Sequence, residues 1–422
     1  MNKKKPNKPR LLLIGDAVVP TGFGRVVHHI ALSLKADFEI HHLGINYHGD
    51  PHDLPWRVYP AAIGGEAFGY SRLPTLLNTI QPEIVMVVCD VWVMATYAHI
   101  LQPYKERLRT VGYFPLEGAP LSPSIAASLN IFDRLVAYNQ FGANTIREAF
   151  EQAQTQDSTI FPRDFDTIPH GVDTDVFKPL FGALEGDRSE AKKRLFPEGE
   201  EYHDSFVVFN GNRNQPRKRI DTTMKGFALF AKDKPANVKL YLHMGTTDVG
   251  WDIIEMATRL NIDNRLILTS QDKNLPSESP ERQNMIYNAC DVGINTATGE
   301  GWGLVSFEHA ATGAAQLIPN HSACSELWQG FAEMMEPSYS LTTPDIMTEA
   351  WFLTEETVAS GIQALYDDPK LKRERDRQAL EVATLPEYQW SRIGDQWKSI
   401  LQELLHCHPR SAQLHLTQRQ TG

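Results

Sequence analysis

The chain has 422 residues, 42% of them hydrophobic, which allows two or three domains with buried cores and excludes a disordered or fibrous protein. Its formal net charge of −11 disfavours a protein that works mainly by neutralising nucleic acid or an anionic membrane surface. No apolar run is long enough to cross a bilayer, and the four widely spaced cysteines form no Cys-x-x-Cys pair. We therefore expect a cytoplasmic protein whose fold does not depend on disulfides.

In the first half of the chain, short apolar runs alternate with helical patterns. Residues 1–9 are basic and are predicted to form a solvated tail. A strand at 10–15 is followed by a glycine-containing turn and by a helix from about residue 25 to 35. This alternation predicts a mostly parallel sheet covered by helices on both faces. Its further strands are expected at 38–43, 84–89, 110–114 and 135–138.

A second alternating series follows residues 179–206, where proline, glycine and charged residues gather. We therefore predict a first domain at 10–180 and a second at 181–387. The last helix, at about 388–406, is expected to pack back on the first domain and to precede a polar tail at 407–422. The second series has strands at 206–210, 239–243, 266–269, 291–295 and 316–319 and helices at 221–232, 251–260, 280–289, 305–311 and 322–328.

The most informative motif is Thr298-Gly-Glu-Gly-Trp-Gly-Leu304, which joins a predicted strand to a predicted helix. Ligands of open parallel sheets bind beyond the carboxyl ends of the strands, where a glycine turn leaves backbone N–H groups accessible to an anion. Glu300 in the turn and Glu308 on the helix can then reach opposite sides of a bound diphosphate. The simpler interpretation, in which Glu300 caps the helix and Glu308 is solvated, is disfavoured by the other motifs of the chain.

Four segments resemble, in order and spacing, the large family of retaining glycosyltransferases that includes sucrose synthases, bacterial mannosyltransferases and surface-polysaccharide enzymes. They are Pro20–Gly24, Ile168–Pro179, Asn210–Lys218 and Glu300–Glu308, and together they extend over nearly the whole chain. The resemblance implies an α/β protein with the GT-B fold, in which two Rossmann-like domains face each other across a cleft.

The resemblance also assigns roles to the two acids of the glycine motif. Glu300 matches the glutamate that contacts the transferred sugar, and Glu308 matches the one that binds the ribose hydroxyls of the donor. Backbone N–H groups of the turn and of the helix start are expected to point at the diphosphate, where negative charge develops as the sugar leaves. The donor-binding residues of this motif are Gly301, Gly303, Leu304 and Glu308.

Basic residues after the first strand of the second domain resemble the pair that neutralises the diphosphate. Arg213 and Lys218 match this pair, which combines a fork-shaped donor with a point charge. Arg217 or Arg219 could replace either of them. With these cations available for the phosphates, the reaction is expected to need neither a metal nor a cofactor.

In the first domain, Gly22 and Gly24 would let the loop after the first strand approach the donor closely, because glycine has no side chain to obstruct it. Many relatives place a histidine near the reacting sugar, and here the corresponding stretch is Pro115–Pro120. Glu117 either occupies the equivalent position as a catalytic residue or is a loop carboxylate in water. Trp92, after Asp90 at another strand end, is either a sugar-stacking residue or a core tryptophan.

Other patterns in the chain do not require a ligand. Asp164-Phe-Asp166 and Asp173-Thr-Asp175 satisfy an Asp-x-Asp pattern but lie within or just before the connection between the domains. His170 and His243 are cleft candidates, although structural histidines with satisfied hydrogen bonds are commoner.

The function that the resemblance implies is retaining transfer of a hexose from a nucleoside-diphosphate sugar to an acceptor hydroxyl, without a metal. Three alternatives remain: a non-catalytic sensor of sugar nucleotides, a phosphorylase or epimerase of the same architecture, and an enzyme that modifies a nucleobase or another macromolecule, which the acidic composition disfavours. A nucleic-acid partner is not expected. The donor base and sugar, and whether the acceptor is a sugar, a lipid or a macromolecule, are not encoded in any motif that we identified.

Overall fold

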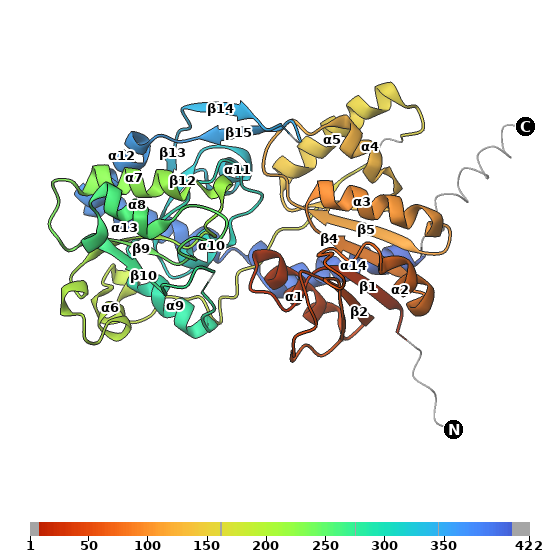
Figure 1. Ribbon diagram of the computed structural model, residues 1–422, viewed down its shortest axis with the longest axis horizontal. Coiled ribbons are helices and arrows are strands. Elements are labelled where there is room, and N and C mark those ends of the chain that lie inside the picture. The colour runs from red at the N-terminus through yellow and green to blue at the C-terminus, as the bar shows by residue number, and fades with distance from the viewer. Residues whose placement is uncertain (1–7, 161–162, 275, 345, 407–422) are drawn as a thin grey trace, which may run out of the picture. The chain divides into compact units, whose positions relative to one another are not determined.

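The computed structural model describes residues 8–160, 163–274, 276–344 and 346–406 (Figure 1). The predicted tails at 1–9 and 407–422 lie almost entirely outside the described residues. The chain divides into two compact units, which are described separately. The N-terminal unit comprises Met1–Gly171, Asp345–Thr348 and Trp390–Gly422, and the C-terminal unit comprises Val172–Pro344 and Glu349–Gln389.

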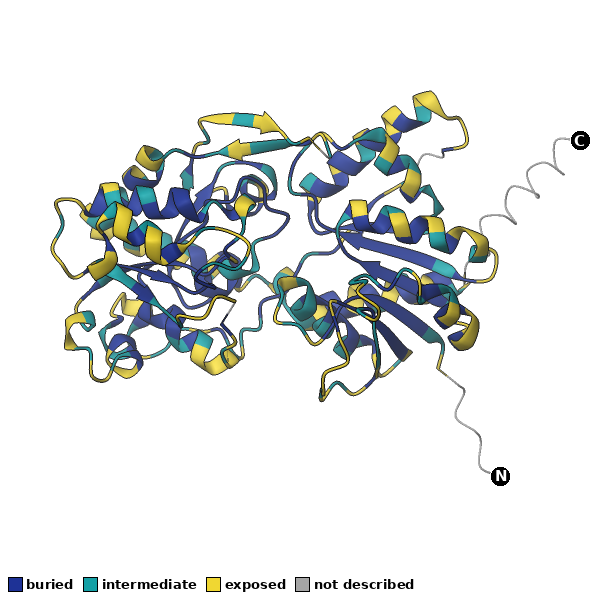
Figure 2. Ribbon diagram, in the orientation of Figure 1, coloured by how far each residue is buried: buried dark blue, intermediate teal, exposed yellow. Residues whose placement is uncertain are grey.

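The N-terminal unit contains a parallel seven-stranded sheet in the order β3-β2-β1-β4-β5-β6-β7. All residues of β4 and all but the first of β1 are buried, as expected for central strands covered on both faces (Figure 2). The strands are β1 (Arg10–Asp16), β2 (Glu39–Ile45), β3 (Arg57–Pro60), β4 (Ile84–Val88), β5 (Arg109–Phe114), β6 (Arg134–Ala137) and β7 (Asp166–Thr167).

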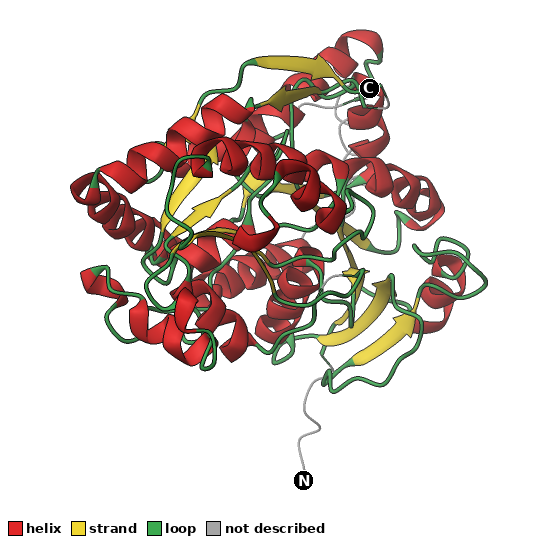
Figure 3. Ribbon diagram, turned by 60° about the vertical axis from the view of Figure 1, so that its left-hand side comes forward, coloured by secondary structure: helices red, strands yellow, loops and turns green. Residues whose placement is uncertain are grey.

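Helices flank this sheet (Figure 3). The first one begins where the Thr21 hydroxyl accepts a hydrogen bond from the Gly24 N–H at 3.0 Å, and it buries an apolar face against the sheet. A Cβ at Gly24 would lie 2.6 Å from the carbonyl oxygen of Val19, so this tight entry requires glycine. The helices are α1 (Gly22–Leu34), α2 (Leu73–Ile80), α3 (Val91–Leu101), α4 (Pro123–Ser128), α5 (Gln140–Gln156) and α14 (Trp390–His406).

The last helix, α14, packs against α1 within the N-terminal unit. The Trp390 ring stacks on His29 with centroids 4.4 Å apart, and Trp397 is fully buried. Gly394 lies so close to Ser33 that a Cβ would approach its side chain to 2.6 Å. The C-terminal segment therefore completes the core of the N-terminal unit, although it follows the other unit in sequence.

The C-terminal unit contains a parallel six-stranded sheet in the order β10-β9-β8-β11-β12-β13 and an antiparallel hairpin, β14-β15. The sheet strands are β8 (Phe206–Asn210), β9 (Val238–Leu242), β10 (Leu266–Leu268), β11 (Val292–Ile294), β12 (Ala315–Pro319) and β13 (Glu333–Met335), and the hairpin strands are β14 (Tyr339–Thr342) and β15 (Glu349–Phe352). The helices are α6 (Ser189–Leu195), α7 (Ile220–Ala231), α8 (Ile253–Leu260), α9 (Pro280–Ala289), α10 (Leu304–Ala310), α11 (Ser322–Trp328), α12 (Glu355–Asp367) and α13 (Pro369–Ala383).

The division between the units falls after Gly171, earlier than the boundary at residue 180 that the sequence predicted. The reason is that Val172 already bonds to the C-terminal unit, where its N–H donates to the carbonyl oxygen of Tyr388 at 2.9 Å. The predicted second boundary at 387 lies close to the observed one after Gln389. Among the described residues, none of the helices has the length and apolar character needed to cross a bilayer.

Candidate active site

Two loops of the C-terminal unit meet because the strands before them are neighbours. Strand β8 pairs with β11 in parallel, with Val208 opposite Val292, so both strands end at the same edge of the sheet. The glycine-rich segment Asn295–Gly303 follows β11, and a short 3-10 turn, Pro216–Lys218, lies between β8 and α7. The backbone joins them directly, since the Thr298 N–H donates to the carbonyl oxygen of Arg217 at 2.8 Å.

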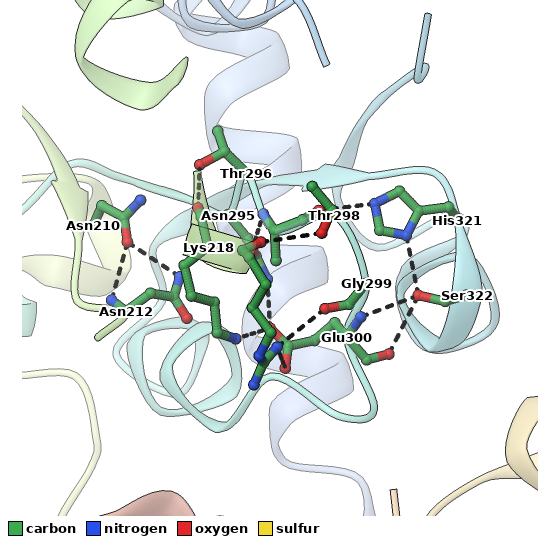
Figure 4. Close-up of polar contacts among 12 residues, drawn as sticks. Asn210, Asn212, Lys218, Asn295, Thr296, Thr298, Gly299, Glu300, His321 and Ser322 are labelled. Atoms are coloured by element: carbon green, nitrogen blue, oxygen red, sulfur yellow. Dashed lines mark hydrogen bonds and ion pairs between the residues drawn. The ribbon is translucent and has the colours of Figure 1, made fainter. Parts of the chain in front are cut away.

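At this junction, the side chains of Lys218 and Glu300 form a buried ion pair (Figure 4). Each side chain is 8% exposed, and the ammonium donates a hydrogen bond to Oε2 of the carboxylate. Asn295 Nδ2 lies 3.4 Å from the same oxygen, and the guanidinium of Arg217 lies 3.9 Å from Oε1. A carboxylate that is buried to this extent is thus held by two cations and an amide.

These cations decide the protonation state of Glu300. Burial by itself would raise the pKa of the carboxyl, but the charges of Lys218 and Arg217 and the hydrogen bonds to Glu300 outweigh it and hold the pKa below its ordinary value. Glu300 is therefore ionised at neutral pH. It can accept hydrogen bonds from a hydroxyl but cannot serve as a general acid.

Hydroxyl and amide groups support the loop that carries Lys218. The Thr296 hydroxyl donates to the carbonyl oxygen of Lys218 at 2.9 Å and lies 2.7 Å from the hydroxyl of Thr223. Asn210, the last residue of β8, donates to Thr223 Oγ1 at 2.9 Å. The sequence analysis assigned no role to these three polar residues, although Asn210 begins one of the segments that it singled out. A signal was present for two of them, because Asn210 ends β8 and Thr296 lies two residues beyond β11, at the edge where ligands bind.

The other sequence candidates of the C-terminal unit have separate partners. Arg213 makes a two-pronged ion pair with Asp248, with N–O distances of 2.7 and 3.0 Å. Glu308 is buried on α10 and accepts a hydrogen bond from the Tyr287 hydroxyl at 3.0 Å. Gly301 is buried in the loop, and Gly303 adopts a φ of +92° immediately before Leu304, the first residue of α10. Binding of a donor by these residues stays a prediction.

The remaining candidates belong to the N-terminal unit. Gly22 is the first residue of α1 and Gly24 lies in its first turn, while Glu117 is half-buried in the loop after β5. Trp92, near the start of α3, is 49% exposed and is therefore not a core tryptophan. A single site that unites these residues with Glu300 stays a prediction.

The two histidines that the sequence analysis named, His170 and His243, both have side-chain hydrogen-bond partners. His170 is buried with Nδ1 2.9 Å from the Tyr113 hydroxyl, and burial lowers its pKa to about 3. His243 follows β9, and its Nδ1 lies 2.7 Å from Thr269 Oγ1. Within the described ranges, no three His, Cys, Asp or Glu side chains are grouped so that they could hold a metal ion. Independence from a metal stays a prediction.

A cavity of about 210 Å³ lies in the N-terminal unit between α1, β2 and the segment before β3. His42 donates from Nε2 to the carbonyl oxygen of Gly15 at 3.1 Å, and its burial lowers its pKa to about 4, which leaves Nδ1 as a hydrogen-bond acceptor. Within the described part of the chain, this Nδ1 and the indole N–H of Trp56 are both buried without a hydrogen-bond partner. The lining includes Asp16, Gly24, Arg25, His28, His42 and Trp56.

Comparison with known proteins identifies the fold. No family model matches the chain. Two solved structures match over 94% of it: HepE from Anabaena in complex with UDP and glucose, with a TM-score of 0.67 and 16% identity over all of that chain, and sucrose-phosphate synthase from Thermosynechococcus elongatus, with a TM-score of 0.68 and 14% identity over 99% of that chain. The chain has the GT-B fold. A trehalose-6-phosphate synthase studied for glycosyl transfer with retention also matches the GT-B chain, with a TM-score of 0.64 and 14% identity over 93% of this chain and 99% of its own.

The GT-B chain is also related in sequence to glycosyltransferases. A D-inositol 3-phosphate glycosyltransferase from Nocardia farcinica (strain IFM 10152) is 29% identical over 284 residues, which cover 64% of the GT-B chain and 57% of that relative. One from Rhodococcus jostii (strain RHA1) is 28% identical over 193 residues, which cover 44% of the chain and 37% of the relative. The matched region thus spans between about a third and about three-fifths of these relatives' own length.

The Lys218–Glu300 ion pair should make the stability of the protein depend on pH in the acid range. Because folding lowers the pKa of Glu300 from its ordinary 4.5, the pair contributes stability that is fully present above that value and is lost as pH falls through the lower folded pKa. We expect the stability difference between the wild type and Glu300→Gln to narrow below about pH 4. Urea unfolding at a series of pH values measures it. If the stability difference between the wild type and Glu300→Gln stays constant down to the pH of acid unfolding, the pKa of Glu300 is not lowered by folding.

Proposed function

We propose that the protein is a retaining glycosyltransferase that moves a hexose from a nucleoside-diphosphate sugar to an acceptor hydroxyl without a metal. The observation that carries the proposal is the buried Lys218–Glu300 pair at the sheet edge where β8 and β11 end. It places a cation suited to a phosphate beside a carboxylate suited to sugar hydroxyls. The names of the sequence relatives support glycosyl transfer, and the solved complex of HepE with UDP and glucose supports a uridine donor.

In the proposed reaction, the protein acts on the leaving diphosphate and on the position of the sugar. The bond between the anomeric carbon and the phosphate oxygen breaks, and its electron pair stays on the diphosphate. The acceptor oxygen bonds to the anomeric carbon on the same face, and its proton passes to the leaving phosphate oxygen. Lys218 stabilises the developing negative charge, and its three N–H donors allow it to hold Glu300 and a phosphate oxygen together.

The neighbouring residues are proposed to complete donor binding. Glu300 accepts hydrogen bonds from hydroxyls of the hexose, since it is ionised and already fixed by Lys218 and Asn295. Glu308 accepts from the ribose hydroxyls, with the Tyr287 hydroxyl orienting its carboxylate. Arg213 supplies a second cation for the diphosphate. Its ion pair with Asp248 is kept and holds the orientation of the guanidinium group.

The acceptor is proposed to bind in the cavity of the N-terminal unit. The cavity lining carries the carboxylate of Asp16, the guanidinium of Arg25 and the imidazole of His28, which together offer hydrogen-bond donors and acceptors to a ligand. A ligand with several hydroxyl groups can pair with them, whereas an apolar ligand leaves them without the hydrogen bonds that they make to water. The cavity thus favours a compound rich in hydroxyl groups.

The proposal is tested with the purified full chain. We expect calorimetric titration to show binding of UDP and UDP-glucose, and release of UDP from UDP-glucose to accelerate when a hydroxyl-bearing acceptor is added. A panel of free and phosphorylated polyols and hexoses supplies the acceptors. Binding without turnover on any of them would favour the sensor alternative, whereas release that needs only inorganic phosphate would favour a phosphorylase. Absence of binding to UDP-, GDP- and ADP-sugars would refute the proposal.

His28→Phe is expected to weaken acceptor binding while leaving the donor site intact. The substitution removes the hydrogen-bonding ring nitrogens of a residue that lines the cavity and keeps an aromatic ring, so KM for the best acceptor of the panel should rise by up to about tenfold. Initial-rate measurements at saturating UDP-glucose give this KM, and calorimetry gives the UDP affinity, which should not change. An unaltered acceptor KM would exclude this cavity as the acceptor site.

A further inference from the structure

Ser322 adopts a backbone conformation that is unusual for its residue type. Its φ is +47°, in the left-handed region that favours glycine, and it is the first residue of α11, after β12. Strained non-glycine residues persist only where the surroundings hold them, and they cluster at functional sites. The Ser322 hydroxyl oxygen lies 3.2 Å from the backbone nitrogen and 3.3 Å from the carbonyl oxygen of Glu300. The unusual conformation thus brings a side chain to the backbone of the carboxylate that the proposed function places at the sugar.

His321 holds this hydroxyl from the other side. Nε2 of its buried ring lies 2.9 Å from the carbonyl oxygen of Ala297, and Nδ1 lies 3.0 Å from Ser322 Oγ. Because a carbonyl oxygen can only accept, Nε2 carries the hydrogen and donates. Burial lowers the pKa of His321, so the ring is neutral and Nδ1 is an acceptor for the serine hydroxyl.

The hydrogen bonds therefore have one consistent direction. The Glu300 N–H donates to Ser322 Oγ (Figure 4), and Nε2 of His321 donates to the carbonyl oxygen of Ala297. The Ser322 hydroxyl has one hydrogen, which it donates to Nδ1 of His321 at 3.0 Å because that acceptor is closer than the carbonyl oxygen of Glu300 at 3.3 Å. The chain of bonds closes on the glycine-rich segment, since Ala297 and Glu300 are three residues apart in it. Two adjacent side chains thus fix both ends of this stretch of backbone, while Lys218 fixes the carboxylate itself.

We propose that His321 and Ser322 are positioning residues that set where the Glu300 carboxylate meets the transferred sugar. The inference rests on the proposed function, because it assigns these residues to the same site. Neither residue needs to touch the substrate. Their effect is expected in steps that depend on the sugar and not in binding of the nucleoside diphosphate alone.

Ser322→Gly separates this role from a contribution to stability. Glycine adopts positive φ without strain, which offsets part of the stability lost with the hydroxyl's hydrogen bonds, so the variant should remain folded. We expect kcat for UDP-glucose to fall by about tenfold, as for loss of one hydrogen bond, with the Kd of UDP unchanged. Asn261→Gly is the matched control, because Asn261 also has a positive φ, +55°, but caps the C-terminus of α8 and is not part of the site. It should keep the wild-type kcat.

A rescue variant and a double variant complete the test. Ser322→Asn tolerates positive φ and offers an amide oxygen to the Glu300 N–H, so it should retain more activity than Ser322→Gly. His321→Phe should lower kcat by a similar factor, and adding Ser322→Gly to it should have little further effect, because the two residues act through one chain of bonds.

The outcomes separate the inference from the proposed function. If the wild type turns over UDP-glucose and Ser322→Gly does so equally well, the positioning role is wrong and the function stands. If Ser322→Gly loses UDP affinity in proportion to kcat, Ser322 maintains the site as a whole, and the positioning role is again wrong. If the wild type binds UDP-glucose without turnover, the positioning role is tested by comparing the affinities for UDP-glucose and for UDP. Ser322→Gly should then reduce the difference between the two affinities. A wild type that binds no sugar nucleotide would refute both.

Discussion

Glu300→Gln is expected to reduce kcat for glycosyl transfer by about 10²- to 10³-fold, the range seen when one electrostatic contact to a transition state is removed. Glutamine has nearly the same shape, but it carries no charge and has one carbonyl oxygen in place of two carboxylate oxygens. The developing positive charge on the sugar then loses the anion beside it, and the sugar hydroxyls lose their strongest acceptor. The Kd of UDP should change little, because the residues proposed to bind the diphosphate are cations. Steady-state kinetics and calorimetry on the same preparation measure both quantities.

Glu374→Gln is the control for this experiment, since Glu374 is an exposed residue of α13 and lies outside the candidate site. It should behave as the wild type in both measurements. A Glu300→Gln variant that keeps most of its turnover would show that the carboxylate is structural. Loss of UDP binding together with turnover would instead indicate that the loop had collapsed.

Lys218→Met is expected to lower the free energy of unfolding by about 3 kcal/mol or more, since removal of one partner leaves a buried charge without its compensation. Both side chains of the pair are only 8% exposed, so water replaces the lost ammonium only in part. Arg217, 3.9 Å from the carboxylate, compensates only in part and keeps the expected loss near the lower end of the usual 3–5 kcal/mol range. Urea unfolding of the variant and the wild type at neutral pH measures the difference.

The double variant Lys218→Met, Glu300→Gln gives the coupling between the two residues. It removes both charges, so its loss of stability should be smaller than the sum of the two single losses. Two buried neutral groups of similar volume do not carry the desolvation cost of a single unpaired charge. Single losses that simply add would show that the two side chains do not interact in the folded protein.

The amino-acid sequence by itself determined the architecture and the identity of several candidate residues. Central strands such as β1 and β4 are buried on both faces, so they appear in the sequence as continuous apolar runs. The glycine turn after β11 and the basic residues after β8 are equally local, because turn chemistry and charge are properties of short segments. For that reason Glu300 and Lys218 could be named from the sequence. The short strands β3, β7 and β13 and the hairpin of β14 and β15 were missed, since these segments are only partly buried and have no long apolar run.

The tertiary structure decided which of the named residues meet. Lys218 and Glu300 are 82 positions apart and come into contact because β8 and β11 are neighbours in the sheet, an order that sequence separation does not reveal. The folded unit also pairs Arg213 with Asp248, which follows the neighbouring strand β9, and Glu308 of α10 with Tyr287 of α9. The proposed roles of His321 and Ser322 depend on hydrogen bonds to a loop more than twenty residues earlier, and a positive φ at serine has no signature in sequence. The sequence therefore shows which chemical groups the chain carries, whereas the distances between these groups depend on which strands lie side by side in the folded protein.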